Sequence, residues 1–456
     1  METEHIMLDQ LDGFAWNKFH RRASIALGLG WGMDAFEVTL IGSILGVLGP
    51  LWHLNGLALS AILGVWFAGI MLGALGFGIL TDRYGRRVIF LASLVLYGTA
   101  TFLTAFTQGI GGLLFLRFMA GVGVGAEYAA VNAAIAEFMP SAKRGFAASF
   151  VMNFWSIGTL LAALLAWLVF ALLPAADGWR LIFASGGVVA FATLWLRRQL
   201  PESPRWLLAQ GRDAEAAAIV QAIGQGVVPL TSLAVAPAQP RRIKTRFWAD
   251  FRALITHHKS VLALGCVLDF AEAGGYYGLF AFLPLAVLPN LHLGATALPP
   301  FYIAGSLGAL LGGIMVSLLL DRLGRKPVVS FFYGATALAC LGFAKWVNAD
   351  IWVLGGGFVL VNLLATASWV GAYPTFSELF PTRLRATGIG ISVAVGRIGA
   401  LISPFLMDFA GKAGLAAALA VLAGFWLIGF LAMLVWWFVG IEANGVPLER
   451  LNKLPA

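Results

Sequence analysis

The sequence predicts an all-α membrane protein with twelve transmembrane helices arranged in two bundles of six. Three observations lead to this fold class. The chain of 456 residues is 60% hydrophobic and 11% charged, whereas soluble domains have about 45–50% apolar and about 25% charged residues. Twelve apolar stretches have roughly the 20 residues that a helix needs to cross a bilayer, and motifs of the first six recur in the second six. This composition excludes a soluble enzyme, a disordered chain and a fibrous protein.

Short polar connections separate the predicted spans. The spans cover residues 23–49, 57–80, 88–107, 112–138, 145–172, 178–197, 260–288, 297–320, 327–348, 351–377, 386–408 and 414–439. The predicted domains are a cytoplasmic N-terminal segment 1–22, a first bundle 23–197, a cytoplasmic linker 198–259, a second bundle 260–439 and a cytoplasmic tail 440–456. The N-terminal segment is too polar for a signal peptide, and we expect at most a short interfacial helix there.

The positions of the basic residues predict the orientation of the chain. If the N-terminus is cytoplasmic, most of the 30 lysines and arginines lie in cytoplasmic segments, and Arg197 at the end of the sixth span is counted among them. The outer loops then carry Arg180, Lys345 and Lys412. This bias is the positive-inside pattern of multi-pass proteins. We therefore expect an inner or plasma membrane protein with both termini in the cytoplasm, and we attribute the net charge of +8 to topology and not to nucleic-acid binding.

Charged motifs recur in the two halves at a nearly constant distance. DRYGRR begins at Asp82 and DRLGRK at Asp321, 239 residues later, while Glu137 and Glu378 are 241 residues apart. Glycine permits a tight turn, aspartate caps or pairs at a helix end, and the arginines reach carboxylates on neighbouring helices. We expect a cytoplasmic gate, with Glu137 and Glu378 as acceptors, that comprises Asp82, Arg83, Gly85, Arg86, Arg87, Glu137, Arg144, Asp321, Arg322, Gly324, Arg325, Lys326, Glu378 and Arg385. The alternative is that these charges only orient the loops.

Seven charged side chains fall at membrane depth, where a charge is costly and indicates function. They are Asp34, Glu37, Arg117, Glu127, Asp269, Glu272 and Arg397. The same three-residue spacing in Asp34/Glu37 and Asp269/Glu272 places each pair on one helical face, and we expect both faces to meet a central cavity, with chance polar lining as the alternative. Because five acids face two bases, at least three carboxyls must be protonated, hydrated or sharing a proton, which predicts proton coupling by these acids and Arg117.

Arg397 is also the main candidate for binding a solute. A fixed guanidinium near mid-membrane grips a carboxylate in bidentate fashion. Candidate walls and hydrogen-bonding groups are Trp31, Phe36, Asn153, Trp155, Tyr276, Tyr277, Trp369 and Tyr373, although core packing is the alternative for any one aromatic residue. The excess of acids equally suits an organic cation, so that the charge of the solute stays open.

Over its full length the chain resembles transporters of the major facilitator superfamily. The strings similar to its sugar-porter-like branch are DRYGRR, RFMAGVGVG at 117–125, PESPRWLL at 201–208, DRLGRK and IEANGVPLER at 441–450. The resemblance implies the major facilitator fold and a proton-coupling pair formed by Asp34 and Arg117. The glycines at 121, 123 and 125 suit close helix packing. We expect a monomer in the lipid bilayer whose partners are a small solute and protons.

Other strings resemble the organic-ion branch, which includes niacin-type and aromatic-acid:proton symporters. The glutamines typical of sugar porters are missing from FVMNFWSIG at 150–158 and from span seven, while AEAGGYYGLFAFLP, RATGIGISVAVGRIGALISP and DAFEVTLIG resemble the organic-ion branch. We therefore predict proton symport of a small organic, aromatic carboxylate by alternating access between the two repeats. A proton-coupled sugar or organic-cation transporter, a uniporter and a non-transporting sensor are the alternatives.

Several other classes of protein do not match the sequence. Cys266 and Cys340 lie in apolar stretches without partner spacing, which predicts neither a disulfide nor a metal site. No GxxxxGK[ST] string for a nucleotide-driven pump occurs, and no ring of repeated selectivity elements indicates a channel. The six histidines fall in loops or tails, away from a buried nucleophile, which argues against an enzyme. We expect no cofactor.

Overall fold

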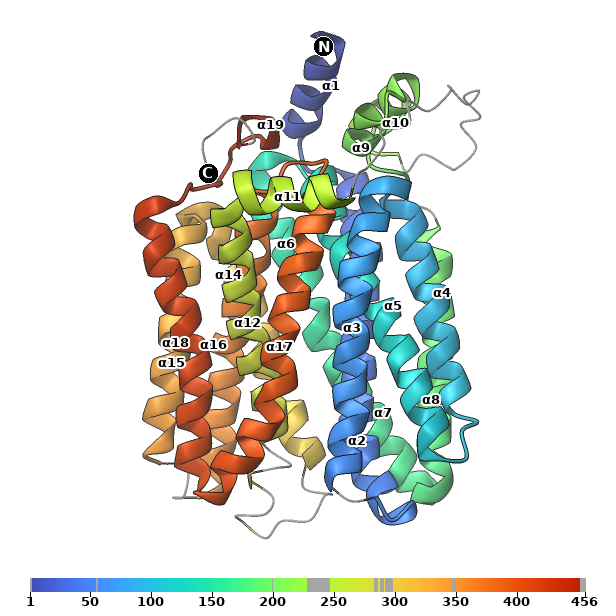
Figure 1. Ribbon diagram of the computed structural model, residues 1–456, viewed down its shortest axis with the longest axis vertical. Helices are drawn as coiled ribbons and strands as arrows, with labels where there is room; N and C mark the ends of the chain where they lie inside the picture. The colour runs from blue at the N-terminus through green and yellow to red at the C-terminus, as the bar shows by residue number, and fades with distance from the viewer. Residues whose placement is uncertain are drawn as a thin grey trace.

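The computed structural model describes residues 2–54, 56–198, 200–227, 247–282, 286–287, 291, 298–346 and 350–451. Within these ranges, eleven helices are long and apolar enough to cross a membrane. Helix α12, Lys259–Phe282, stands at the place of the seventh predicted span. Figure 1 shows the long helices side by side, with those of the N-terminal half next to those of the C-terminal half. The predicted twelve-helix, all-α fold is confirmed.

Each predicted span overlaps one long helix, except that two helices share the fifth span. The first half contains α2 (Lys18–Leu51), α3 (Gly56–Tyr84), α4 (Arg86–Thr104), α5 (Ile110–Phe138), η1 (Ser141–Lys143), α6 (Arg144–Met152), α7 (Phe154–Leu172) and α8 (Ala175–Arg197). The second half contains α12, α14 (Leu298–Leu323), α15 (Arg325–Ala344), α16 (Ile351–Ser377), α17 (Arg385–Lys412) and α18 (Leu415–Val439). Parts of the connection between spans seven and eight, and residues 228–246 of the predicted linker, lie outside the described residues.

Glycines bring the backbones of neighbouring helices into contact. A Cβ added at Gly121 would press against the carbonyl oxygen of Trp66 on α3, and one added at Gly123 would meet Tyr97 on α4. Gly125 faces α3 in the same way as Gly121. Lipid tails are as apolar as leucine, so close packing of small residues is a main source of helix association in a bilayer. The predicted packing role of these glycines is confirmed.

The outer surface of the helix bundle is apolar. Phe438 is 86% exposed, Phe409 77% and Leu172 72%. Contiguous exposed apolar surface of this kind is unfavourable in water and suits the hydrocarbon core of a bilayer. The arrangement therefore agrees with a multi-pass membrane protein.

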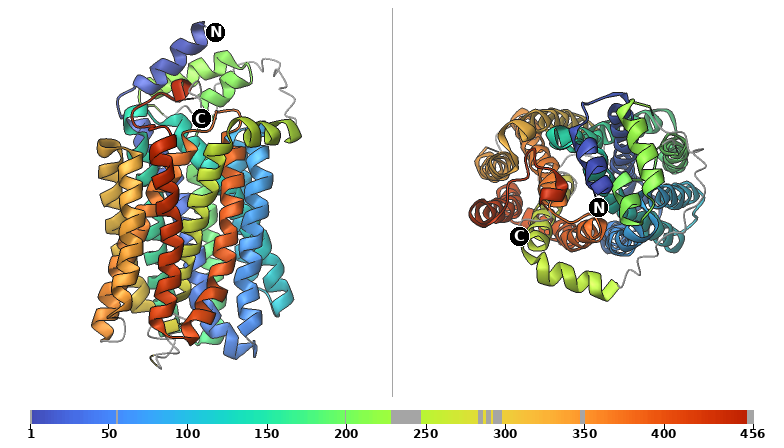
Figure 2. Two further views of the ribbon diagram at one scale, coloured as in Figure 1. Left: turned by 60° about the vertical axis from the view of Figure 1, so that its left-hand side comes forward. Right: turned by 90° about the horizontal axis from the view of Figure 1, so that it is seen from above.

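Short helices gather at one end of the bundle, together with both described chain ends (Figure 1). They are α1 (Glu2–Gly13), α9 (Pro204–Ala209), α10 (Asp213–Gly224), α11 (Phe247–His257) and α19 (Leu448–Leu451). We call this end the inner end, following the predicted orientation. Seen from this end, α1 lies over the middle of the ring of long helices (Figure 2). The predicted short N-terminal helix is thus present, but its Leu8 packs with Trp206 and Leu207 of α9.

Candidate functional site

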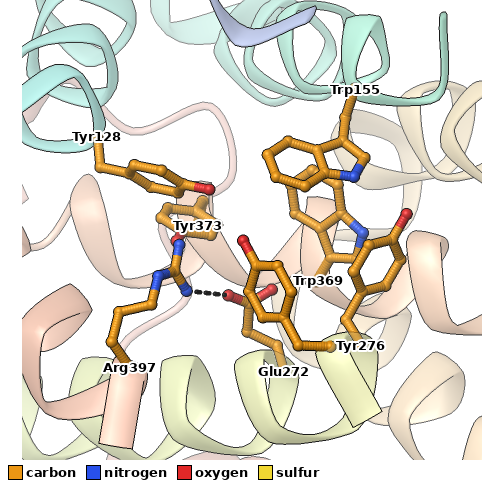
Figure 3. Close-up of a pocket in the computed structure, with 8 residues that line it drawn as sticks. Tyr128, Trp155, Glu272, Tyr276, Trp369, Tyr373 and Arg397 are labelled. Atoms are coloured by element: carbon orange, nitrogen blue, oxygen red, sulfur yellow. Dashed lines mark ion pairs between the residues drawn. The ribbon is translucent and has the colours of Figure 1, made fainter. Parts of the chain in front are cut away.

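A small cavity lies between the two halves of the bundle. The first half contributes Tyr128 of α5 and Trp155 of α7, and the second half contributes Glu272, Tyr276 and Tyr277 of α12, Trp369 and Tyr373 of α16 and Arg397 of α17. Figure 3 shows these side chains converging from both halves. A site between two repeats, near the middle of the long helices, suits alternating access to the two sides of a membrane.

Aromatic rings form most of the cavity wall. The ring centroids of Trp155 and Trp369 are 5.8 Å apart, and those of Tyr276 and Trp369 are also 5.8 Å apart. Trp31 stacks behind Trp369 at 6.4 Å. At these separations the rings touch one another, so a solute enters only when they move apart.

Arg397 and two acids form a charged cluster, the cavity cluster, at one side of this space. Nη1 of Arg397 is 3.5 Å from Oδ2 of Asp269 and 3.5 Å from Oε1 of Glu272. Tyr373 donates a hydrogen bond of 2.7 Å to Asp269, and the guanidinium lies 4.5 Å from the ring centroid of Tyr128. Nη1 is thus engaged with both acids, whereas the buried Nε has no hydrogen-bond partner within the described residues. The Nε–H group therefore remains available as a donor to a further acceptor.

A second buried cluster lies inside the first half, around Glu37. Nη1 of Arg117 pairs with Oε1 of Glu37. The hydroxyl of Thr101 donates to Glu37 at 2.7 Å, and Arg117 donates to Thr104 at 2.8 Å. In this conformation Arg117 thus contacts Glu37 and not Asp34, and the proton-coupling role of Asp34 and Arg117 stays a prediction. The two acids are one helical turn apart on α2, and Arg117 meets the one farther along the chain.

Asp34 itself is fully buried at 0% exposure. Within the described residues it is the one acid of the five at membrane depth that makes neither a hydrogen bond nor an ion pair. The charged groups that act on it are Glu127, Arg197 and Glu37 from its own half and Arg397 from the other half. An ionised carboxylate without water or partners costs several kcal/mol. Asp34 is therefore the acid whose ionised form this conformation supports least.

Arg197 is a buried residue, although the charge pattern assigned it to the basic residues of the cytoplasmic side. Its side chain has 0% exposure and pairs with Glu127. It also donates to the carbonyl oxygens of Ala26 at 3.2 Å and Leu27 at 3.1 Å on α2. A side chain at Gly30 would collide with this pair. The Arg197 side chain at the end of α8 therefore lies between the helices. Three buried arginines, rather than two, thus offset the five acids at membrane depth.

We expect Arg197→Met to destabilise the protein strongly, because it leaves Glu127 buried without its cation. Breaking a buried pair on one side costs about 3–5 kcal/mol. Thermal unfolding of the detergent-solubilised protein measures the effect. In the Glu127→Gln/Arg197→Met double variant most of the loss should be recovered. An equal loss in the single and double variants would show that the pair itself is unimportant.

At the inner end, the aspartate of each repeated motif binds a helix N-terminus in the opposite half. Oδ2 of Asp82 accepts hydrogen bonds of 2.8 Å from both the N–H and the hydroxyl of Thr387 in the first turn of α17. Asp321 accepts the N–H groups of Gly145 at 3.0 Å and Phe146 at 2.7 Å in the first turn of α6. The positive end of each helix dipole adds to these bonds. Contacts between the halves therefore close this end.

The two glutamates predicted as acceptors do bind arginines. Glu137 is 2.7 Å from Nη2 of Arg86 in its own half and 3.1 Å from Nη1 of Arg385 in the other half. Glu378 is 2.9 Å from Nη2 of Arg325. All five side chains are buried. These are the ion pairs that the repeated motifs predicted, and one of them connects the halves.

The turn of the first motif is shaped by Gly85, which has φ of 100°. The Glu202 carboxylate lies where its side chain would be. Glu202 accepts the backbone N–H groups of Arg86 at 2.8 Å and Arg87 at 3.2 Å, and so caps α4. Burial raises the pKa of Glu202 above its usual range, although the N–H of Ser203 and the Arg86 guanidinium act in the opposite direction.

The second motif repeats this turn. Gly324 has φ of 92°, and Glu442 accepts the backbone N–H groups of Arg325 at 3.0 Å and Lys326 at 2.9 Å. The ammonium of Lys326 also donates to the carbonyl oxygen of Gly440 at 2.7 Å. Glu202 and Glu442 are therefore structural partners of the motifs, a role that their 240-residue separation signals.

Some predicted gate residues do not make ion pairs with the glutamates that the motifs predicted as acceptors. Arg83 and Arg322 are exposed. Arg144 is buried, but its ion pair is with Asp12 at 2.9 Å, a residue outside every predicted set. The symmetry of the motifs did not reveal this contact, because Asp12 precedes the first repeat.

The predicted solute-binding residues divide into two groups. Arg397, Trp155, Tyr276, Tyr277, Trp369 and Tyr373 line the cavity. Phe36 lies elsewhere, near Gly186 of α8, and Asn153 donates to the carbonyl oxygen of Leu310 at 3.4 Å, where α6 meets α7. Tyr128 lines the cavity but was missed, because nothing in its local sequence distinguishes it from a core aromatic residue.

Known proteins are similar to this chain in sequence and in fold. Residues 50–454 match the model of a family described as "Sugar (and other) transporter". The niacin transporter NiaP of Acinetobacter baylyi is 30% identical over 406 residues, covering 88% of this chain and 89% of that protein. The inner membrane metabolite transport protein YgcS of Escherichia coli is 31% identical over 460 residues, covering 100% and 98%. The proton:xylose symporter XylE of E. coli, bound to 6-bromo-6-deoxy-D-glucose, has a TM-score of 0.80 at 19% identity, covering 97% of this chain and 100% of that chain.

Two six-helix halves around a shared cavity define a membrane transporter with the major facilitator fold. The chain belongs to the sugar (and other) transporter family of the major facilitator superfamily, because the family match covers most of its length. The resemblance to this superfamily is confirmed, and so is the prediction that the protein is a transporter and not an enzyme.

Proposed function

We propose that the protein carries a small aromatic carboxylate across the cell membrane together with protons, by alternating access. This proposal rests on the buried guanidinium of Arg397, which lines the cavity and whose Nε has no partner among the described residues. A carboxylate accepts two N–H groups from a guanidinium in bidentate fashion. The tryptophan and tyrosine rings around it suit a flat ring. The niacin transporter of A. baylyi, whose name specifies a ring carboxylate, supports an organic anion of this size.

The cavity cluster couples such an anion to a proton. With Asp269 and Glu272 both ionised beside Arg397, the cluster has a net charge of −1. A bound carboxylate makes it −2, and a proton on Glu272 restores it to −1. Glu272 is the acid of the two that lines the cavity. Because each binding event makes the other more favourable, anion and proton are taken up together.

Asp34 binds a proton from one side of the membrane and releases it on the other. It lacks a hydrogen bond or ion pair among the described residues and lies within the electrostatic influence of Arg397, which belongs to the other half. The neutral form of Asp34 is favoured while the inner end is closed. When the halves rock, the distance to Arg397 and the access of water change, and the proton is released on the inner side.

One observation favours a second candidate, the transport of an organic cation. Glu272 faces the same cavity with its side chain 7% exposed. A cation placed there contacts the carboxylate and the surrounding aromatic faces. In that case Arg397 serves only to offset the negative charges of Asp269 and Glu272.

A binding screen with the purified protein separates the two candidates. The probes are nicotinate, benzoate, benzyltrimethylammonium and D-xylose. We expect the two carboxylates to bind at least about tenfold more tightly than the other probes, in keeping with a charge-assisted contact. Preferential binding of the ammonium probe that is lost in Glu272→Gln would favour the second candidate. Binding of D-xylose alone would contradict both.

The inner-end contacts form the gate of this cycle, and we expect Asp82→Asn to open it. The substitution removes the charge that binds Thr387, and a charge-assisted hydrogen bond contributes about 1.5–3 kcal/mol. The inward-open population should rise about tenfold. Spin labels at Arg83→Cys and Arg322→Cys, in a background with Cys266→Ala and Cys340→Ala, report the separation of the halves. Distances that remain unchanged would contradict a gating role, and Asp177→Asn at the exposed outer end of α8 is the control.

The positions of the basic residues support the remaining parts of the proposal. The short helices and the gate lie at one end together with both described chain ends, and this end carries most of the basic motifs, as a cytoplasmic face does. Because one chain encloses a complete cavity, a monomer is sufficient for transport.

A further inference from the structure

Asp12 at the end of α1 joins two arginines at the inner end. Its Oδ1 is 2.9 Å from Nη2 of Arg144 on α6, and its Oδ2 is 2.8 Å from Nη2 of Arg205 on α9. Asp12 is 7% exposed, Arg144 1% and Arg205 3%. A buried carboxylate between two buried guanidinium groups is a specific ionic contact, unlike a solvated surface pair.

This contact breaks the symmetry between the two halves of the gate. Arg385 pairs with Glu137 of the opposite half at 3.1 Å. Its counterpart Arg144 is therefore expected to pair with Glu378, the counterpart of Glu137. Glu378 does act on Arg144 electrostatically, but the carboxylate within ion-pair distance is that of Asp12. The N-terminal helix thus supplies an acid that the repeated motifs do not.

The charges around Arg144 explain why this acid matters for closure. Arg205 of the linker and Arg325 of the opposite half repel Arg144, and Arg385 of the opposite half is also repelled by it. The repulsions by Arg325 and Arg385 act between the halves, so they are felt when the inner end is closed and weaken when the halves separate. The negative charges of Glu378 and Asp12 offset these repulsions, so removal of the Asp12 charge leaves more of the repulsion between the closed halves uncompensated.

Apolar and polar contacts hold α1 in this position. Met7 and Leu8 pack with Trp206 and Leu207 of α9. Beyond α1, the side chain of Asn17 donates to the carbonyl oxygen of Ile223 on α10 at 2.7 Å. Figure 2 shows α1 over the middle of the helix ring, where the halves meet.

A further bond extends the contact to the C-terminal segment. Nη1 of Arg144 donates to the carbonyl oxygen of Val446 at 3.3 Å. Arg144 therefore contacts α1 through Asp12 and the segment after α18 through Val446. Opening of the inner end moves α6 away from that segment and ends the bond.

We infer that Asp12 is a gating residue and that α1 is a lid that stabilises the inward-closed conformation. The lid stabilises the closed inner end in addition to the contacts of the two repeated motifs. It shifts the equilibrium between the inward-closed and inward-open conformations, whichever solute is carried.

Asp12→Asn tests the inference directly. The variant keeps the size of the side chain and removes its charge, and the inward-open population should rise about tenfold, since removal of one partner from a buried charge pair has large effects. The separation of spin labels at Arg83→Cys and Arg322→Cys, with Cys266→Ala and Cys340→Ala, reports this population without any solute. The result is therefore independent of the binding screen.

Two further proteins complete the test. Asp9→Asn changes an exposed acid of the same helix and should leave the distances as in the parent protein. Deletion of residues 2–13 removes both the charge and the helix, and should give the same opening as Asp12→Asn. If Asp12→Asn and the deletion both keep the parent distances, the lid has no gating role. If only the deletion opens the inner end, the packing of α1 acts without the carboxylate and the role of Asp12 is contradicted.

Discussion

Arg397→Ala is expected to reduce the uptake efficiency kcat/KM for nicotinate or benzoate about a hundredfold or more. The guanidinium is buried beside the cavity, and its Nε has no partner among the described residues. Truncation of a buried, hydrogen-bonded charge costs about 2–5 kcal/mol, part of which arises from the acids left without their cation. Initial rates of radiolabelled solute uptake into proteoliposomes measure the effect.

Two variants control this experiment. Arg397→Lys keeps the charge but not the planar fork, and should retain part of the activity. Lys412→Ala removes a cation from the same helix whose side chain is 72% exposed, and should leave uptake unchanged. If Arg397→Ala transports carboxylates with the parent kinetics, the anion proposal loses its basis.

Asp34→Asn is expected to abolish accumulation of the solute against its gradient while exchange of internal for external solute continues. An amide cannot carry a proton between the two sides, whereas the cavity residues that bind the solute are unchanged. Entry of one monovalent carboxylate with one proton moves no net charge, so the pH gradient drives accumulation, and each pH unit corresponds to about tenfold accumulation that the variant should lose. Uptake driven by an imposed pH gradient, compared with counterflow at equal pH, separates the two activities.

The control for Asp34→Asn is Asp408→Asn, which changes a half-exposed acid on α17 and should preserve both activities. An Asp34→Asn protein that still concentrates its solute would remove Asp34 from the coupling mechanism. Loss of both accumulation and counterflow would point to a structural role for Asp34 instead.

The helices and the gate pairs could be predicted because they depend on local patterns. Apolar stretches of membrane length mark the spans regardless of tertiary contacts. The pairs Arg86–Glu137 and Arg325–Glu378 follow from the duplication, since each motif folds in the same way in both halves. Most of the cavity residues were also found, because aromatic and charged groups at mid-membrane are few.

The pairing among buried charges could not be predicted in the same way. Asp34 and Glu37 are one turn apart, and a small rotation of α2 decides which of them meets Arg117. Arg197 lies at a helix end, where sequence alone does not tell whether a long side chain points to water or into the bundle. The predicted surplus of acids was nevertheless a signal that a further buried cation exists.

Asp12 illustrates a contact that depends on tertiary packing alone. It lies before the first span, and its partners Arg144 and Arg205 are more than a hundred residues away in sequence. Nothing in the duplication predicts it, because Asp12 lies outside the repeated motifs. Such contacts emerge only when the short helices are placed over the inner end.

Proton flux driven by the solute shows whether solute and protons move together. Proteoliposomes containing the protein and an internal pH-sensitive dye are exposed to an inward gradient of nicotinate or benzoate, whichever binds more tightly, at equal pH on both sides. The account predicts acidification of the lumen that requires the protein and disappears in Asp34→Asn. Solute uptake at the parent rate without any change of internal pH would contradict it.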